Sequence, residues 1–222
     1  MVPPMHRHRY TRFTLLVPVL LLAAAILAPG PSGSLAKASG SGAPPAADPA
    51  ICDHFITEAE RTRGIPSQLL SAIGVVESGR WQASGQPVRP WPWTVTAASV
   101  GRNGRFFDSR DEAIAWVRTL QAEGVRNIDV GCMQINLAAH PHAFATLEEA
   151  FSPAANVAYG ADYLARQYAA TRGWAQAVGN YHSSTRSFHR AYRQKVLRAW
   201  PLEQRRAAEL RRQARLAALA ED

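Results

Sequence analysis

The chain has 222 residues, of which 47% are hydrophobic, and a formal net charge of +8. This length suits one domain with flanking segments. The positive charge is concentrated towards the two ends, because residues 39–185 contain 11 Lys and Arg against 13 Asp and Glu. The central part is therefore close to neutral and lacks the basic face that nucleic-acid binding requires, so we expect no nucleic-acid partner.

Residues 1–38 have the order of features that is typical of a secretory signal peptide. Three arginines precede an apolar run at residues 13–28, and small residues follow as far as Ala38. The run has 16 residues, fewer than the roughly 20 that a membrane-spanning helix needs. We expect export with cleavage after Ala38. An uncleaved N-terminal anchor is the alternative.

The rest of the chain divides into three parts. Residues 39–48 are Gly, Ser, Ala, Pro and a final Asp, which predicts a flexible lead-in. Residues 49–200 are expected to form the folded domain. Residues 201–222 predict a basic helical tail, which is either simply solvated or in contact with an anionic membrane surface or an acidic partner.

Two neighbouring helices are predicted at the start of the domain. Asp48 before Pro49 indicates a helix start, and Gly64 indicates its end. The second helix is expected to begin with Pro66 in its first turn and to end at Gly79. Its apolar face repeats at intervals of three and four residues, at Leu69, Leu70, Ile73 and Val76. The short link predicts that the two helices pack antiparallel.

The last turn of this second helix carries one carboxylate, Glu77. The negative end of the helix dipole and burial beside Val75 and Val76 would both disfavour its charged form and raise its pKa. A carboxylic acid that stays protonated near neutral pH can give its proton to a leaving group. The alternative is a solvated glutamate at a fraying helix end.

A β-hairpin is predicted next, with strands at residues 94–100 and 105–107 and a turn at residues 102–104. Before it, the alternation with proline forces Trp91 and Trp93 into an extended segment, where they point the same way. The hairpin would form one wall of a cleft. Indole rings bind the apolar faces of sugars well, but core packing explains tryptophans at least as often.

Caps and periodicity predict further helices at residues 109–124, 146–152, 153–173 and 174–183, with helical sequence again from Phe188. Ser109 with Glu112 and Thr146 with Glu149 are capping boxes. Residues 125–137 are predicted to be irregular.

Several polar residues of this middle region are candidate binding or metal-ligating groups. The amide side chains of Gln134 and Asn136 can bind a hydroxyl or an N-acetyl group. His140 and His142 lack acidic or cysteine partners at a familiar spacing, so neither a metal nor another cofactor is expected.

Cys52 and Cys132 are the two cysteines of the chain. In an exported protein they are expected to form a disulfide, which would close a loop of about 80 residues and constrain the unfolded chain by roughly 4 to 5 kcal/mol. Two separate thiols are the alternative.

Three motifs occur in an order that identifies a family. Glu77-Ser78-Gly79 ends a helix, the run Gly131-Cys132-Met133-Gln134-Ile135-Asn136 follows, and Gly179-Asn180-Tyr181-His182-Ser183 lies in a late helix. This pattern resembles the soluble lytic transglycosylase catalytic domain, which is related in fold to goose-type lysozyme. The resemblance covers about residues 51–200. It implies a mostly α fold of the α+β lysozyme-like type, a helical bundle with a small β-hairpin insert beside the active-site cleft.

The resemblance implies roles for individual residues. Glu77 would be the catalytic acid and base, and Ser78 would orient it or the substrate. The saccharide-binding residues would be Met133, Gln134, Asn136 and Tyr181. Trp91 and Trp93 are further candidates on the chemistry of their indole rings alone, because their insert is not a general family feature and suggests a specialised subgroup. The chain departs from the family pattern where Cys132 replaces leucine and where His182 replaces asparagine.

The implied activity is cleavage of the β-1,4 bond between MurNAc and GlcNAc in the glycan strands of peptidoglycan, in the bacterial periplasm. The family needs only one carboxyl, because the N-acetyl oxygen of the sugar attacks the anomeric carbon and the 6-hydroxyl then closes a 1,6-anhydro ring.

Three other functions remain open at this point. A muramidase would hydrolyse the same bond with Asp129 as a second carboxylate. A cysteine peptidase would use Cys132 with His140, His142 or His182 as base. A non-catalytic wall-binding module would serve a secretion or motility apparatus.

Overall fold

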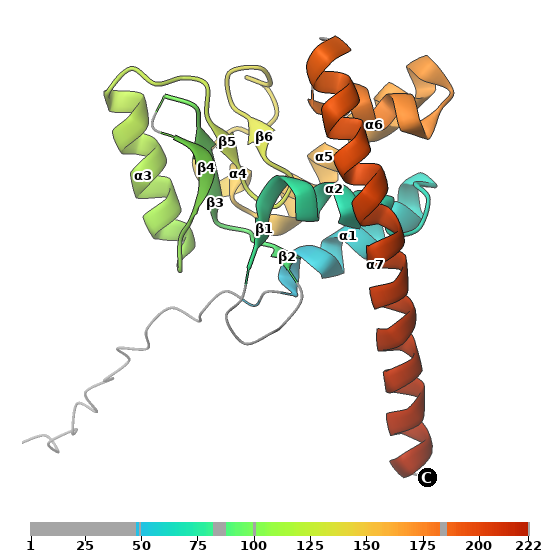
Figure 1. Ribbon diagram of the computed structural model, residues 1–222. Coiled ribbons are helices and arrows are strands. Elements are labelled where there is room, and N and C mark those ends of the chain that lie inside the picture. The colour runs from blue at the N-terminus through green and yellow to red at the C-terminus, as the bar shows by residue number, and fades with distance from the viewer. Residues whose placement is uncertain (1–47, 49, 82–87, 100, 183–185, 222) are drawn as a thin grey trace, which may run out of the picture. The chain divides into compact units, whose positions relative to one another are not determined.

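The computed structural model describes residues 48, 50–81, 88–99, 101–182 and 186–221 (Figure 1). The expected signal peptide and most of the lead-in lie outside these residues. The described residues form seven helices: α1 (Ile51–Arg63), α2 (Leu69–Ser78), α3 (Arg110–Ala122), α4 (Leu147–Ala150), α5 (Pro153–Thr171), α6 (Trp174–His182) and α7 (Arg186–Glu221). The expected mostly α, lysozyme-like fold is thereby confirmed.

Two small antiparallel sheets complete the fold. One pairs β1 (Gly79–Arg80) with β2 (Arg89–Pro90), directly after α2. The other has the order β4-β3-β5-β6 and consists of β3 (Thr94–Ala97), β4 (Gly101–Phe106), β5 (Asp129–Val130) and β6 (Ile135–Asn136). The two short strands β5 and β6 lie in the segment that was expected to be irregular. They were missed because two-residue strands leave no periodic signal.

The hairpin is confirmed as β3 and β4, but the prediction of its turn at residues 102–104 was wrong. These residues belong to β4, and the chain instead turns just before Gly101. Gly101 has a φ of 138°, which favours glycine, and the β3–β4 register shifts between Val95 and Ala97. The Asn-Gly sequence at residues 103–104 is typical of a turn, but these two residues lie within β4, which is hydrogen-bonded to β3.

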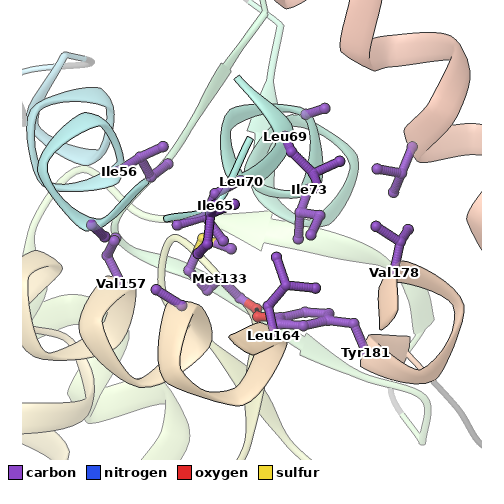
Figure 2. Close-up of a cluster of buried hydrophobic side chains, with 14 of the residues drawn as sticks. Ile56, Ile65, Leu69, Leu70, Ile73, Met133, Val157, Leu164, Val178 and Tyr181 are labelled. Atoms are coloured by element: carbon purple, nitrogen blue, oxygen red, sulfur yellow. Dashed lines mark hydrogen bonds between the residues drawn. The ribbon is translucent and has the colours of Figure 1, made fainter. Parts of the chain in front are cut away.

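The structure has two hydrophobic cores. The first lies among α1, α2, α5, α6 and α7, and Figure 2 shows Ile56, Leu69, Ile73, Met133 and Leu164 converging in it. The second lies between the four-stranded sheet, α3 and α4, where Val117, Leu120, Val130 and Phe151 are fully buried. Both predicted N-caps are present, since Ser109 Oγ accepts from Glu112 N at 3.2 Å and Thr146 Oγ1 accepts from Glu149 N at 3.1 Å. The two glutamate side chains accept from the backbone N–H one residue before each cap rather than from that of the cap itself.

The helix that carries Glu77 starts later than predicted. α2 begins at Leu69 rather than near Pro66, because Gln68 takes a left-handed conformation with a φ of 66°. The buried carboxylate of Glu60 on α1 caps this start. It accepts hydrogen bonds from the backbone N–H of Gln68 at 2.7 Å, Leu70 at 2.8 Å and Ser71 at 3.1 Å.

The C-terminal helix α7 continues through Pro201 without a break and extends past residue 200 (Figure 1). The first turns after Pro201 are docked on the domain. Glu203 is 6% exposed, and Arg206 bonds both to Glu203 at 2.6 Å and to Asp53 of α1 at 3.3 Å. Further along, Arg212 pairs with Glu209. Part of the positive charge of the predicted tail is therefore already neutralised within the chain.

We predict that Glu60→Gln destabilises the domain by about 2 kcal/mol, because an amide nitrogen would face backbone donors that the carboxylate now accepts from. Urea unfolding followed by circular dichroism would measure the loss. Glu58→Gln is the matched control: it lies on the same helix, is exposed, and pairs only with the exposed Arg61. Its unfolding midpoint should lie close to that of the wild type, because an exposed ion pair contributes little to stability. Equal shifts of the two unfolding midpoints would contradict the capping role.

Candidate active site

A groove of about 1240 Å³ runs between the helical core and the four-stranded sheet. The end of α2 lies in it, together with residues of β3 and β4 and of the segment from Asn127 to His140. Helices α5, α6 and α7 contribute the facing residues. Of the predicted site residues, four line this groove: Glu77, Gln134, Asn136 and Tyr181.

Glu77 is half-buried in the last turn of α2, at the wall of the groove, and neighbouring groups desolvate its carboxyl. Burial raises its pKa from an ordinary value near 4.5 to about 7, and the nearby charge of Asp129 adds to the rise. The Tyr192 hydroxyl and the Lys195 ammonium oppose it by favouring the charged form. Because burial dominates, Glu77 is protonated over a range of pH in which an ordinary glutamate is charged.

Tyr192 reaches this carboxyl from α7. Its ring is 5% exposed, and its hydroxyl is buried without a well-directed hydrogen bond among the described residues. The hydroxyl is nevertheless close enough to Glu77 that each group shifts the pKa of the other. The Tyr192 ring stacks on His182, with ring centroids 4.7 Å apart and an interplanar angle of 11°. The histidine thus helps to hold the hydroxyl beside Glu77.

Asp129 is a second carboxylate in the groove. Burial raises its pKa, and a hydrogen bond from the Asn136 side chain at 2.8 Å counteracts the rise. The Asn136 carbonyl oxygen accepts from the backbone N–H of Ala138 and Ala139 at 3.0 and 2.8 Å. Asn136 is therefore fixed from both ends and holds Asp129 in place.

Gln134 and Tyr181 line the groove while their polar groups are engaged. The Gln134 amide donates to the carbonyls of Thr94 at 3.0 Å and Gly131 at 3.1 Å. The Tyr181 hydroxyl donates to the Met133 carbonyl at 3.0 Å, and Figure 2 shows its ring pointing at that residue. Both side chains are therefore held in place by backbone carbonyls at the groove wall, with Gln134 8% and Tyr181 9% exposed.

Ser78 and Met133 do not line the groove. The Ser78 hydroxyl, on a residue 1% exposed, donates to the Cys132 carbonyl at 2.6 Å. Met133 is fully buried, and its backbone N–H donates to Asn156 Oδ1 at 2.8 Å. Both residues join α2, α5 and the segment 131–136, so they position the groove residues rather than contact a ligand.

Trp91 and Trp93 also lie away from the groove. Trp91 is 6% exposed and its indole N–H donates to the Phe107 carbonyl at 2.7 Å, while Trp93 packs against the core of the sheet. Their rings meet edge to face, 6.1 Å apart. Because these contacts anchor the hairpin, the expected stacking of sugars on the two indoles does not enter the proposed site.

Cys52 and Cys132 form a disulfide, as expected, and both are fully buried. It ties α1 to the segment that carries Gln134. Since Cys132 has no free thiol, it cannot be the nucleophile of a peptidase. Nor do the described residues contain a cluster of histidine, cysteine and acidic side chains suited to a metal ion.

Two important residues were missed by the sequence analysis. Tyr192 is one of them, although its spacing of three residues from Lys195 places the two side chains on the same side of a helix. Asn156 is fully buried and clamps the segment 130–133: its amide donates to Val130 O at 2.9 Å and Ala150 O at 3.0 Å. An isolated asparagine inside a helix gives no sequence signal for such a clamp. Gly131 has a φ of 82°, and a Cβ there would lie 2.3 Å from the Asn156 amide nitrogen.

The comparisons with known proteins gave one match. The family model described as "Transglycosylase SLT domain" matches residues 54–198. No curated protein and no solved structure matches the chain. None of the described helices has the length and apolar character needed to span a membrane.

We predict that Glu77→Gln stabilises the protein in a pH-dependent way. The folded state holds the Glu77 proton more tightly than the unfolded chain does, so the wild type loses stability as the pH rises from about 4.5 to about 7. The amide of the Glu77→Gln variant does not ionise, so the variant does not lose stability in this pH range. Above pH 7 the variant should be more stable by up to about 3 kcal/mol, and below pH 4 the difference should vanish.

Urea midpoints at pH 4, 6 and 8 measure this difference. Glu123→Gln, at the exposed end of α3, is the control for the general effect of replacing a glutamate with glutamine. A Glu77→Gln effect that is constant over the three values would show that burial does not hold the proton on Glu77.

Proposed function

The chain belongs to the transglycosylase SLT domain family, whose domains act on peptidoglycan, and on that premise we propose that it is a lytic transglycosylase. It would cleave the β-1,4 bond between N-acetylmuramic acid and N-acetylglucosamine and leave a 1,6-anhydro end. The single observation that carries the proposal is the buried Glu77 carboxyl, with a pKa of about 7, in a groove large enough for several sugar rings.

The reaction needs one group that is first an acid and then a base. Protonated Glu77 gives its proton to the glycosidic oxygen as the bond to the anomeric carbon breaks, and the N-acetyl oxygen of the same sugar bonds to that carbon. The Glu77 carboxylate then removes the proton of the 6-hydroxyl, whose oxygen displaces the N-acetyl oxygen. The carboxyl ends protonated, as it began.

A pKa near 7 suits both halves of this cycle. Around neutral pH the protonated form of Glu77 is well populated, which serves the first half. In the second half, the Glu77 carboxylate is basic enough to take the proton of the 6-hydroxyl. The Tyr192 hydroxyl and the Lys195 ammonium stabilise the carboxylate that exists between the two halves. A positioned acid or base contributes about 10² to 10⁴-fold, so contacts along the groove must supply the rest.

Among the predicted saccharide-binding residues, Gln134, Asn136 and Tyr181 are those that line the groove and can touch the substrate. We assign Ser78 and Met133 to positioning, because hydrogen bonds fix both in the interior. Export by residues 1–38 and location in the periplasm follow from the substrate as part of the proposal. Contact with a membrane surface or with a secretion or motility apparatus stays a hypothesis.

Hydrolysis of the same bond is the second candidate function, because Asp129 lies in the groove and its charge acts on Glu77. A second carboxylate at this place can hold a water molecule against the sugar instead of leaving the 6-hydroxyl to react. The products separate the two functions, since a hydrolysed end contains one water more than an anhydro end.

We predict that purified peptidoglycan digested with the mature wild type gives 1,6-anhydromuramyl ends, identified by mass spectrometry. Glu77→Gln should lower the rate of their formation by at least about 10²-fold, because an amide cannot donate the proton. Glu123→Gln again serves as the exposed control. Hydrolytic ends would favour the muramidase. Full cleavage activity of Glu77→Gln would contradict the role of Glu77 as the acid, and a Glu77→Gln variant that supports wall function as well as the wild type would favour the non-catalytic binding module.

We also predict that Tyr192→Phe shifts the pH dependence of the reaction. The hydroxyl lowers the pKa of Glu77, so its removal raises that pKa. The first step needs protonated Glu77, so kcat/KM falls as the pH rises through the pKa of Glu77. The pH at which kcat/KM falls should therefore be higher in the variant by about half a pH unit to one pH unit. Tyr168→Phe, whose ring stacks on Trp174, is the control. An unchanged pH profile in Tyr192→Phe would mean that the hydroxyl has no influence on the acid.

A further inference from the structure

One face of α7 forms a wall of the groove. Phe188, Tyr192 and Lys195 line it, and their spacing of four and three residues places them on the same side of the helix. Tyr192 lies beside the Glu77 carboxyl. Lys195 is about 4.5 Å further along the helix axis, less than one helical turn away. A group bound by Lys195 would therefore lie next to the bond that Glu77 protonates.

Lys195 is an exposed cation in this wall, and it makes no ion pair with the part of the chain that the structure describes. Its charge reaches two other groups of the groove. It lowers the pKa of Glu77 against the larger effect of burial, and together with burial it lowers the pKa of His182. The ammonium group thus lies over the site with its charge available to a ligand.

This placement does not favour the first step of the proposed reaction. A cation near Glu77 favours the carboxylate, whereas the first step requires the protonated acid. Burial outweighs the cation, so the acid form survives, but the cation still reduces it. The cation stabilises the carboxylate that exists between the two halves of the cycle, and its position in the groove wall also places it to attract an anion of the substrate.

The chemistry of the substrate supplies a matching anion. The sugar rings of a glycan strand are N-acetylated and neutral, and its negative charges are carboxylates attached to the muramyl ring through the lactyl ether. They belong to the stem peptide where one is present, and to the free lactyl group where the peptide has been removed. We propose that Lys195 binds such a carboxylate on the muramyl residue next to the scissile bond. This inference rests on the proposed function and adds the part of the substrate that is recognised beyond the sugar rings.

The test measures binding in a Glu77→Gln background, so that no turnover occurs and the pKa of Glu77 has no influence. The probes are soluble glycan strands in three forms: with stem peptides, stripped by an amidase so that lactyl carboxylates are free, and stripped and then amidated so that no carboxylate remains. Lys195→Met removes the charge and Lys195→Arg keeps it. Arg190→Met, on the exposed side of α7, is the control for general charge.

Lys195→Met should raise the Kd for carboxylate-bearing strands about 5-fold and leave the Kd for amidated strands unchanged. Lys195→Arg should bind like the parent. If Lys195→Met weakens the binding of peptide-bearing strands alone, the carboxylate belongs to the stem peptide. If Lys195→Met weakens the binding of stripped strands, the carboxylate is that of the lactyl group. Equal effects on all three forms, or no effect on any, would overturn the proposal.

A separate measurement distinguishes an effect on the acid alone. If Lys195→Met leaves every Kd unchanged but moves the pH profile of the active enzyme upward, Lys195 only tunes Glu77 and the binding proposal is wrong. The binding result does not depend on the product formed. Hydrolytic ends in the digest would therefore contradict the proposed function without deciding the role of Lys195.

Discussion

The desolvation of the Glu77 carboxyl, on a residue half-buried at the groove wall, is the constraint on which the rest of the site depends. A carboxyl in water has a pKa near 4.5, and burial raises that of Glu77 to about 7. Keeping the group buried requires α2 to end at a fixed point between the sheet and α7. Glu60 fixes the opposite end of α2 by accepting three backbone hydrogen bonds. Burial raises the pKa of both glutamates, but three backbone donors oppose the rise at Glu60, whereas the Tyr192 hydroxyl and the Lys195 ammonium oppose it at Glu77.

The segment from Gly131 to Asn136 is held against α2 by contacts that reach no ligand. The Ser78 hydroxyl bonds to one of its carbonyls, Asn156 bonds to its backbone on both sides, and the disulfide joins it to α1. These bonds leave Gln134 and Asn136 facing the groove. In this way a motif of consecutive residues divides into side chains that form the groove and side chains that hold it in place.

The sequence predicted most of the helices, the hairpin, the disulfide and the place of Glu77, because caps, periodicity and motif order are local signals. It could not separate Gln134 and Asn136 from Ser78 and Met133. That difference depends on which way each side chain points after the segment has folded onto Asn156. The two tryptophans were overestimated for the same reason: an extended segment fixes their spacing, whereas the Phe107 carbonyl and the sheet core decide what they contact.

The departures from the family pattern can be understood from their contacts. Cys132, in place of leucine, still fills a fully buried position and adds a covalent link to α1. His182, in place of asparagine, stacks on Tyr192 and so supports the hydroxyl beside Glu77 from α6. That hydroxyl is held from a second direction, because α7 continues past the end of the family match and bonds through Arg206 to Asp53. The helix that supplies Tyr192 and Lys195 is therefore anchored at both ends of its contact with the domain. This anchoring keeps the Tyr192 hydroxyl and the Lys195 ammonium at a constant distance from the Glu77 carboxyl.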